Sequence, residues 1–173
     1  MRRGVQWIGP VLALVLLLAG TASAQGWTAF SPEGGRCKVD MPGTPKVETT
    51  PLNSPGQTLT MTEAKVQAGG ATFAMSWIDY PERIALSASS DVMLDKVRDG
   101  MAAGNTLRGE KKLTLGRAQG REFTLAQANG TTTAVRLYWA RNRLYQLGVT
   151  GRAGVESQPE TRHFFESFAL VRS

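Results

Sequence analysis

The chain has 173 residues, a formal net charge of +6 and 42% hydrophobic residues. This length suits one domain with a buried core. The modest positive charge favours anionic surfaces and does not indicate nucleic acid as a partner. Cys37 is the only cysteine, which excludes an internal disulfide. We expect it to be a small buried hydrophobe in a strand over Arg36–Met41, with a reactive thiol as the alternative.

The first 24 residues have the layout of a cleaved secretory signal. Arg2 and Arg3 precede an apolar run, Ile8–Ala19, and the small residues Ala22-Ser23-Ala24 follow. A membrane-spanning helix needs roughly 18 or more apolar residues, so this run is too short. We expect cleavage before Gln25, one domain over residues 25–173 without a transmembrane helix, and a periplasmic or secreted location. Loss of Arg2 and Arg3 lowers the net charge to +4.

Two strand pairs are expected in the mature chain. Thr58–Gln67 and Thr72–Tyr80 flank Gly69-Gly70, a pair typical of a primed two-residue turn. This register places Ala64 and Met75 on one face and Met61 on the other, which favours core packing over a methionine copper site. A short strand over Cys37–Met41 precedes them, and Thr49–Gln57, with two prolines, reads as an exposed loop.

The second pair joins Arg121–Ala128 to Thr131–Ala140 through Asn129-Gly130, the best short hairpin signal in the chain. A further strand over Leu144–Val149 completes a meander. With a two-residue turn, Arg121 lies opposite Tyr138 and Phe123 lies opposite Arg136, on one side of the sheet.

Two helices are expected. Ser90 or Asp91 caps the first, which runs to about Ala103 and has Leu94, Val97 and Met101 as its apolar stripe. The pattern Ser157-Gln158-Pro159-Glu160 predicts a capping box for the second, whose aromatic face is Phe164, Phe165 and Phe168. The sum is an α+β domain with a mainly antiparallel sheet.

The two ends of the mature chain carry a family resemblance. The chain resembles exported bacterial proteins of unknown function with a PsbP-like fold. The segments that carry the resemblance are Trp27–Gly34, Cys37–Pro45, Gly120-Arg121-Glu122, Arg143–Leu147 and Phe164–Leu170. That fold is shared by PsbP, the extrinsic photosystem II subunit, and by a nuclear import factor that binds Ran. The resemblance implies an α/β/α sandwich with six to seven strands and two principal helices. It also implies binding of partner proteins rather than chemistry. Cys37 departs from the family pattern, which favours an aromatic residue there.

Basic residues crowd the stretch from 108 to 121 and recur in the meander that follows. This basic cluster consists of Arg108, Lys111, Lys112, Arg117, Arg121, Arg136, Arg141 and Arg143. Arginine beside aromatic residues suits an anionic ligand or a protein interface. The candidate ligand or partner surface is therefore Arg121, Phe123, Arg136, Tyr138 and Arg143, and the alternative is an ordinary cationic surface.

Catalytic and metal sites have weaker support. His163, the only histidine, has Glu160 and Glu166 three residues to either side, which fits either a metal site or a solvated charged face. An acidic stripe of Asp91, Asp95 and Asp99 likewise fits either a cation-binding site or a solvated charged face. No Gly-x-Ser-x-Gly elbow supports a hydrolase that uses His163. We expect no cofactor and no catalytic residue.

Three hypotheses follow. The first is an exported, non-catalytic accessory domain that binds another protein of the bacterial envelope. The second is a binding module for a small anionic or lipidic ligand, placed at the basic and aromatic side of the meander. The third is a hydrolase.

Overall fold

The computed structural model describes residues 26–54 and 57–171, which form two antiparallel sheets. The signal sequence expected over residues 1–24 lies outside this range. The large sheet has seven strands, and α2 (Ser90–Ala102) packs on one of its faces. In spatial order the strands are β3 (Lys46–Ser54), β4 (Gln57–Ala68), β5 (Ala71–Asp79), β9 (Arg143–Arg152), β8 (Thr131–Ala140), β7 (Ala118–Ala126) and β6 (Thr106–Leu115).

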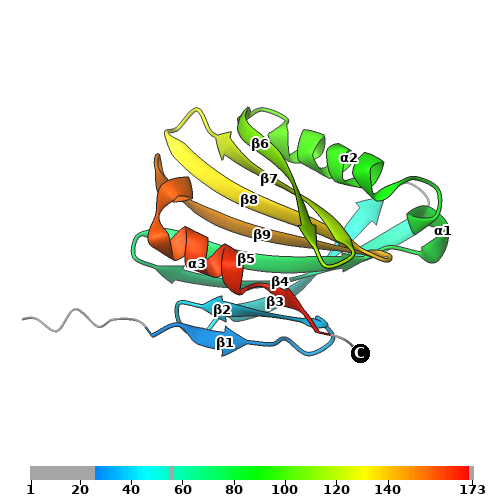
Figure 1. The fold of residues 1–173 in the computed structure, drawn as a ribbon, viewed down its shortest axis with the longest axis horizontal. Coiled ribbons are helices and arrows are strands. Elements are labelled where there is room, and N and C mark those ends of the chain that lie inside the picture. The colour runs from blue at the N-terminus through cyan, green and yellow to red at the C-terminus, as the bar shows by residue number, and fades with distance from the viewer. Residues whose placement is uncertain (1–25, 55–56, 172–173) are drawn as a thin grey trace, which may run out of the picture.

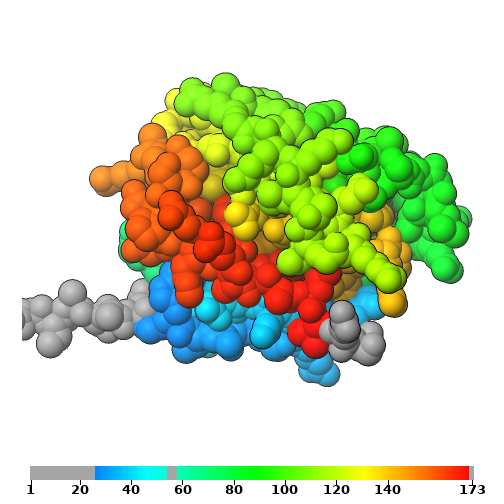
Figure 2. Space-filling model, viewed as in Figure 1, coloured from blue at the N-terminus to red at the C-terminus, as the bar shows by residue number. Residues whose placement is uncertain are grey.

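The opposite face carries the C-terminal elements and a small sheet (Figure 1). That sheet has the order β1 (Thr28–Phe30), β2 (Cys37–Met41) and β10 (Ala169–Leu170). Beside it lie η1 (Val155–Ser157) and α3 (Pro159–Ser167), while the short α1 (Glu82–Ala85) precedes α2. Figure 2 shows α3 and the small sheet packed against one another. The expected fold is confirmed: an α+β domain with a mainly antiparallel sheet and two principal helices. No described helix is long and apolar enough to cross a membrane.

Each face of the large sheet has its own core. On the α3 face, Phe73, Met75 and Tyr145 pack with Phe164 and Phe168. On the α2 face, Leu94 packs with residues such as Phe123, Leu137 and Leu144. Because side chains alternate along each strand, a residue's position in the register decides which core it enters.

The β4–β5 hairpin forms in the predicted register. Ala64 pairs with Met75 and Met61 with Ile78, so the two methionines lie on opposite faces as expected. Gly69 and Gly70 both have positive φ, as a type I′ turn requires.

The predicted β7–β8 register is wrong by one residue. Gln127 donates its N–H to the Thr131 carbonyl, and the Gly130 N–H donates to the Gln127 carbonyl, so the loop has three residues rather than two. Gly130 has φ 82°, the left-handed position of such a loop. Arg121 therefore pairs with Leu137, and Phe123 pairs with Val135.

The loop predicted over Thr49–Gln57 is a strand along most of its length. β3 pairs with β4 from Lys46 to Ser54, and Pro51 lies within it. β3 is the edge of the sheet, where a proline without an N–H breaks no ladder.

The helices differ from prediction at their starts. Ser89, rather than Ser90 or Asp91, caps α2 by accepting the Val92 N–H. The predicted capping box does not form, because Ser157 belongs to η1 and Gln158 begins α3 without a side-chain cap. The apolar stripe and the burial of the three phenylalanines are confirmed, although Phe168 follows α3 as its C-cap instead of lying within the helix.

Cys37 is buried in the core of the α3 face, as predicted. Burial raises the pKa of its thiol to about 11, against a smaller lowering by the nearby Arg143 charge. The thiolate is the nucleophilic form of cysteine, so this environment favours the inert reading over a reactive thiol.

Candidate functional site

The five residues of the predicted surface do not lie together. Arg121 and Phe123 are buried on the α2 face, because the register shift turns both side chains toward the helix. Arg136, Tyr138 and Arg143 lie on the α3 face. The expectation that all of them share one side of the sheet is therefore wrong.

Arg121 forms ion pairs with two side chains of α2. Its side chain is 2% exposed and donates to Asp91 at 2.6 Å and to Asp95 at 3.0 Å. Hydrogen bonds from Arg121 lower the pKa of Asp91, which keeps that carboxylate ionised. The acidic stripe thus binds a cation from its own chain, while Asp99 pairs with Arg98 at 2.8 Å.

Arg136 and Tyr138 also make contacts within the protein. Arg136 forms an ion pair with Glu122 and lies 4.9 Å from the centre of the Phe165 ring. Tyr138 stacks on Phe168 with ring centroids 5.5 Å apart. Both side chains therefore hold α3 and its neighbours on the sheet.

His163 does not form a metal site with Glu160 and Glu166. Its Nε2 lies 3.0 Å from an oxygen of Asp40 on β2, and its ring contacts Trp27 edge to face at 4.5 Å. Within the described residues, no group of three His, Cys, Asp or Glu side chains could hold a metal ion.

Arg143 has a different setting, at the edge of a pocket. Its Nε and Nη2 donate to the two Asp79 oxygens at 2.6 and 2.5 Å. Its Nη1 donates to the Gly34 and Gly35 carbonyls at 2.6 and 2.8 Å. Tyr145 also donates to Gly35, at 3.0 Å. Arg143 therefore ties the turn before β2 to the large sheet.

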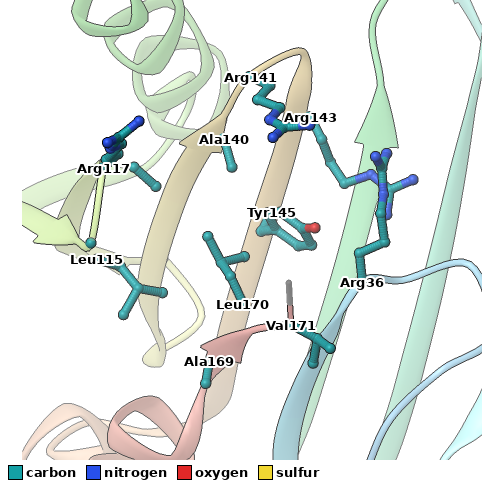
Figure 3. A pocket seen from close by; sticks show the side chains of 12 residues that line it. Arg36, Leu115, Arg117, Ala140, Arg141, Arg143, Tyr145, Ala169, Leu170 and Val171 are labelled. Carbon is teal, nitrogen blue, oxygen red and sulfur yellow. The ribbon is translucent and has the colours of Figure 1, made fainter. Parts of the chain in front are cut away.

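The pocket beside Arg143 has a volume of about 900 Å³ and four arginines in its lining. It forms where four distant segments meet: the segment just before β2, the β6–β7 turn, the β8–β9 turn and the end of β10 (Figure 3). We call it the arginine pocket. Its lining residues are Arg36, Leu115, Gly116, Arg117, Ala118, Ala140, Arg141, Arg143, Tyr145, Ala169, Leu170 and Val171.

Two of these arginines are exposed and unpaired. In the range that the structure describes, neither Arg117 nor Arg141 makes an ion pair or a side-chain hydrogen bond. Arg36 shares Asp79 with Arg143, at 3.2 Å. The lining has no acidic residue, so Asp79 beside the pocket is the counter-ion of the two arginines that it contacts.

The backbone is strained at the same rim. Arg36 has φ 53° and Arg141 has φ 59°, and they are the non-glycine residues with positive φ among those described. This conformation costs non-glycine residues roughly 1–2 kcal/mol, and such strain clusters at binding sites. Sequence reasoning included Arg117 and Arg141 in a broad basic cluster but could not place Arg36 with them, because 81 or more positions separate them along the chain.

A second pocket, of about 720 Å³, lies at the other end of the α3 face. Its lining consists largely of small residues around Trp27 and Phe73, with Arg152 and Glu160 supplying opposite charges. It lacks the charge asymmetry of the arginine pocket.

Comparison with known proteins bears on the fold. No family model and no curated protein matches the chain. Among solved structures, cyanobacterial PsbP (CyanoP) from Synechocystis sp. PCC 6803 aligns with a TM-score of 0.50 at 9% identity, over 90% of this chain and 98% of that one. The fold is therefore PsbP-like. A Pseudomonas aeruginosa protein of unknown function, PA94, aligns with a TM-score of 0.35 at 9% identity, over 79% of this chain and 90% of its own.

Proposed function

We propose that this chain is an exported, non-catalytic accessory domain of the bacterial envelope, and that the arginine pocket is its binding site for an anionic group. The observation that carries the proposal is the unpaired state of Arg117 and Arg141 at the rim of a pocket whose lining has no acidic residue. Guanidinium groups present planar pairs of donors that match phosphate and carboxylate oxygens.

The direct test measures stabilisation by anions. A ligand that binds the native state alone raises the melting temperature. We expect phosphate and carboxylate compounds to stabilise the wild type and to lose this effect in Arg117→Gln/Arg141→Gln. The matched control is Arg108→Gln/Arg162→Gln, which removes the same charge from exposed positions outside the pocket. Equal stabilisation of both double variants would refute the assignment of the pocket.

The export part of the proposal rests on the pattern of residues 1–24. Mass spectrometry of the protein purified from cells should find Gln25 at the N-terminus. Fractionation into periplasm and medium would then locate the mature chain. An intact Met1 on the cellular protein would refute export through a cleaved signal.

A partner protein is the second candidate, favoured by an exposed apolar site. Leu86, between α1 and α2, is 80% exposed, and Val92 nearby in the chain is 44% exposed. Crosslinking of the chromosomally tagged protein in intact cells should capture a stoichiometric partner if this surface is an interface. Leu86→Ser should then reduce the captured species, while a free monomer after crosslinking would count against a protein partner.

A further inference from the structure

We infer that the ligand of the arginine pocket is an amphiphile with one anionic head, a phosphate or a carboxylate, and an apolar body. The inference rests on the proposed function, that the pocket binds an anionic group. It adds the shape and polarity of the molecule that carries this group.

The Arg143 side of the pocket offers a ligand less free positive charge than the other side, because Arg143 and Arg36 share the Asp79 carboxylate. The Arg143 guanidinium is buried and lies against both oxygens of Asp79 and two backbone carbonyls. Arg36 contacts the same Asp79 carboxylate. An anionic group here would compete with a bidentate pair that is already formed, which disfavours a second anionic group at this end of the ligand.

The two arginines without a counter-ion among the described residues lie on two turns. Arg117 follows Gly116 in the β6–β7 turn, and Arg141 lies in the β8–β9 turn. Figure 3 shows Ala140 between these two arginines, with no larger side chain labelled there. Because both guanidinium groups are exposed and unpaired in the described part of the chain, an anionic head is favoured at this end.

The remaining wall is apolar. Leu115 and Leu170 are half-buried in the pocket, and Val171 is 46% exposed. Ala118, Ala140 and Ala169 add small side chains that leave room between the larger ones. An inorganic anion would leave this surface in water, whereas an alkyl chain would cover it. Each buried methylene contributes about 0.8 kcal/mol, or about fourfold in affinity.

The test compares ligands that differ in one part. Calorimetric titration of the protein purified from cells would use decyl phosphate below its micellar concentration, ethyl phosphate and the uncharged decyl maltoside. We expect decyl phosphate to bind at least tenfold more tightly than ethyl phosphate. We expect decyl maltoside to bind at least tenfold more weakly than decyl phosphate.

Variants test which lining residues bind the anionic head and which bind the apolar body. Arg117→Gln/Arg141→Gln should weaken decyl phosphate at least tenfold, while the Arg108→Gln/Arg162→Gln control retains wild-type affinity. Val171→Gln changes an exposed apolar wall residue and should weaken decyl phosphate severalfold without affecting ethyl phosphate. Circular dichroism spectra would verify that each variant folds.

The two proposals fail in different ways. Equal affinity for ethyl and decyl phosphate would overturn the amphiphile while leaving the anion site intact. Failure of every anion to bind would overturn the proposed function itself. Tight binding of decyl phosphate that ignores the Arg117 and Arg141 substitutions would overturn this pocket as the site.

The amphiphile has two sources, a dispersed molecule or a lipid headgroup in a membrane. Flotation with phosphatidylglycerol vesicles, with phosphatidylcholine vesicles as the control, separates them. Arginine-dependent flotation with the anionic vesicles supports the headgroup. Binding of dispersed decyl phosphate without flotation supports the free molecule, and both results support an amphiphile.

Discussion

Arg121 and Arg143 are both buried arginines of the same sheet, yet they lie on opposite faces and bind different parts of the chain to it. Arg121 donates to two carboxylates on one helix, Asp91 and Asp95, which are both 43% exposed, and to the carbonyl of its chain neighbour Gly120. Arg143 donates to one carboxylate, Asp79, and to two backbone carbonyls of a distant turn. One arginine fastens a helix to the sheet, and the other fastens a loop.

The difference shows that residue type and burial do not define a role. Carboxylates that reach water keep much of their hydration if their arginine is removed. The buried carbonyl of Gly35 cannot hydrate in this way, and without Arg143 it keeps Tyr145 as its donor. We therefore expect the two arginines to differ in their contribution to stability.

The largest effect is expected from Arg143→Met. It leaves the Gly34 and Gly35 carbonyls with fewer donors and leaves Asp79 with Arg36 alone. We expect a loss of about 2–3 kcal/mol in the free energy of unfolding, because the buried Gly35 carbonyl loses a donor while Asp79, 48% exposed, can hydrate. Urea denaturation measures it, and a loss smaller than that of Arg121→Met would reverse the comparison.

Arg121→Met should cost less, about 1–2 kcal/mol, because Asp91 and Asp95 can hydrate and this donor is lost by one backbone carbonyl, that of Gly120, rather than by two. The two substitutions have no shared partner and act on opposite faces. Their costs should therefore add to within about 0.5 kcal/mol in the double variant. A larger coupling would mean that the two faces are not independent.

A glycine pair sharpens the comparison of the faces. A Cβ on Gly120 would meet the Leu137 carbonyl at 2.6 Å and the Tyr138 ring at 2.7 Å, on the α3 face. A Cβ on Gly148, on the other face, would meet nothing nearer than 3.9 Å. Gly120→Ala should cost about 1–2 kcal/mol through overpacking. Gly148→Ala should change thermal stability little, and similar costs would contradict the difference in crowding.

Acid should weaken the α2 face through Asp91. Its pKa is lowered in the folded state by hydrogen bonds from Arg121, so folding favours the ionised form. The stability from this shift is present above the unfolded pKa and is lost as the pH falls through the lower, folded pKa. Asp91→Asn should show a smaller fall in melting temperature between pH 7 and pH 3 than the wild type. An unchanged pH dependence would exclude Asp91 as its source.

The smallest effect concerns Cys37, whose labelling rate measures opening of the structure around Arg143. With its pKa raised to about 11, the thiol should react slowly with a disulfide reagent at pH 8 in the folded protein and rapidly in urea. The stability linked to this shift is present below the unfolded pKa and declines as the pH rises through the folded value. Faster labelling in Arg143→Met than in Arg121→Met, each under native conditions, would place the local opening at the turn before β2.

The sequence by itself determined the local elements. Alternation and paired glycines predicted β4 and β5 in register, because a two-residue primed turn leaves one pairing for the strands. The i, i+3, i+7 stripe of Leu94, Val97 and Met101 predicted α2, and the small size and isolation of Cys37 suited a buried position. A resemblance at the two ends of the chain added the PsbP-like architecture.

Tertiary structure decided the register of β7 and β8 and, with it, that Arg121 and Phe123 lie on the face opposite Arg136 and Tyr138. Asn129-Gly130 fits a two-residue or a three-residue loop, and one extra residue turns Arg121 from one face to the other. The arginine pocket joins Arg36, Arg117 and Arg141 from turns far apart in the sequence. No local pattern encodes that meeting, because it depends on how the small sheet packs against the large one.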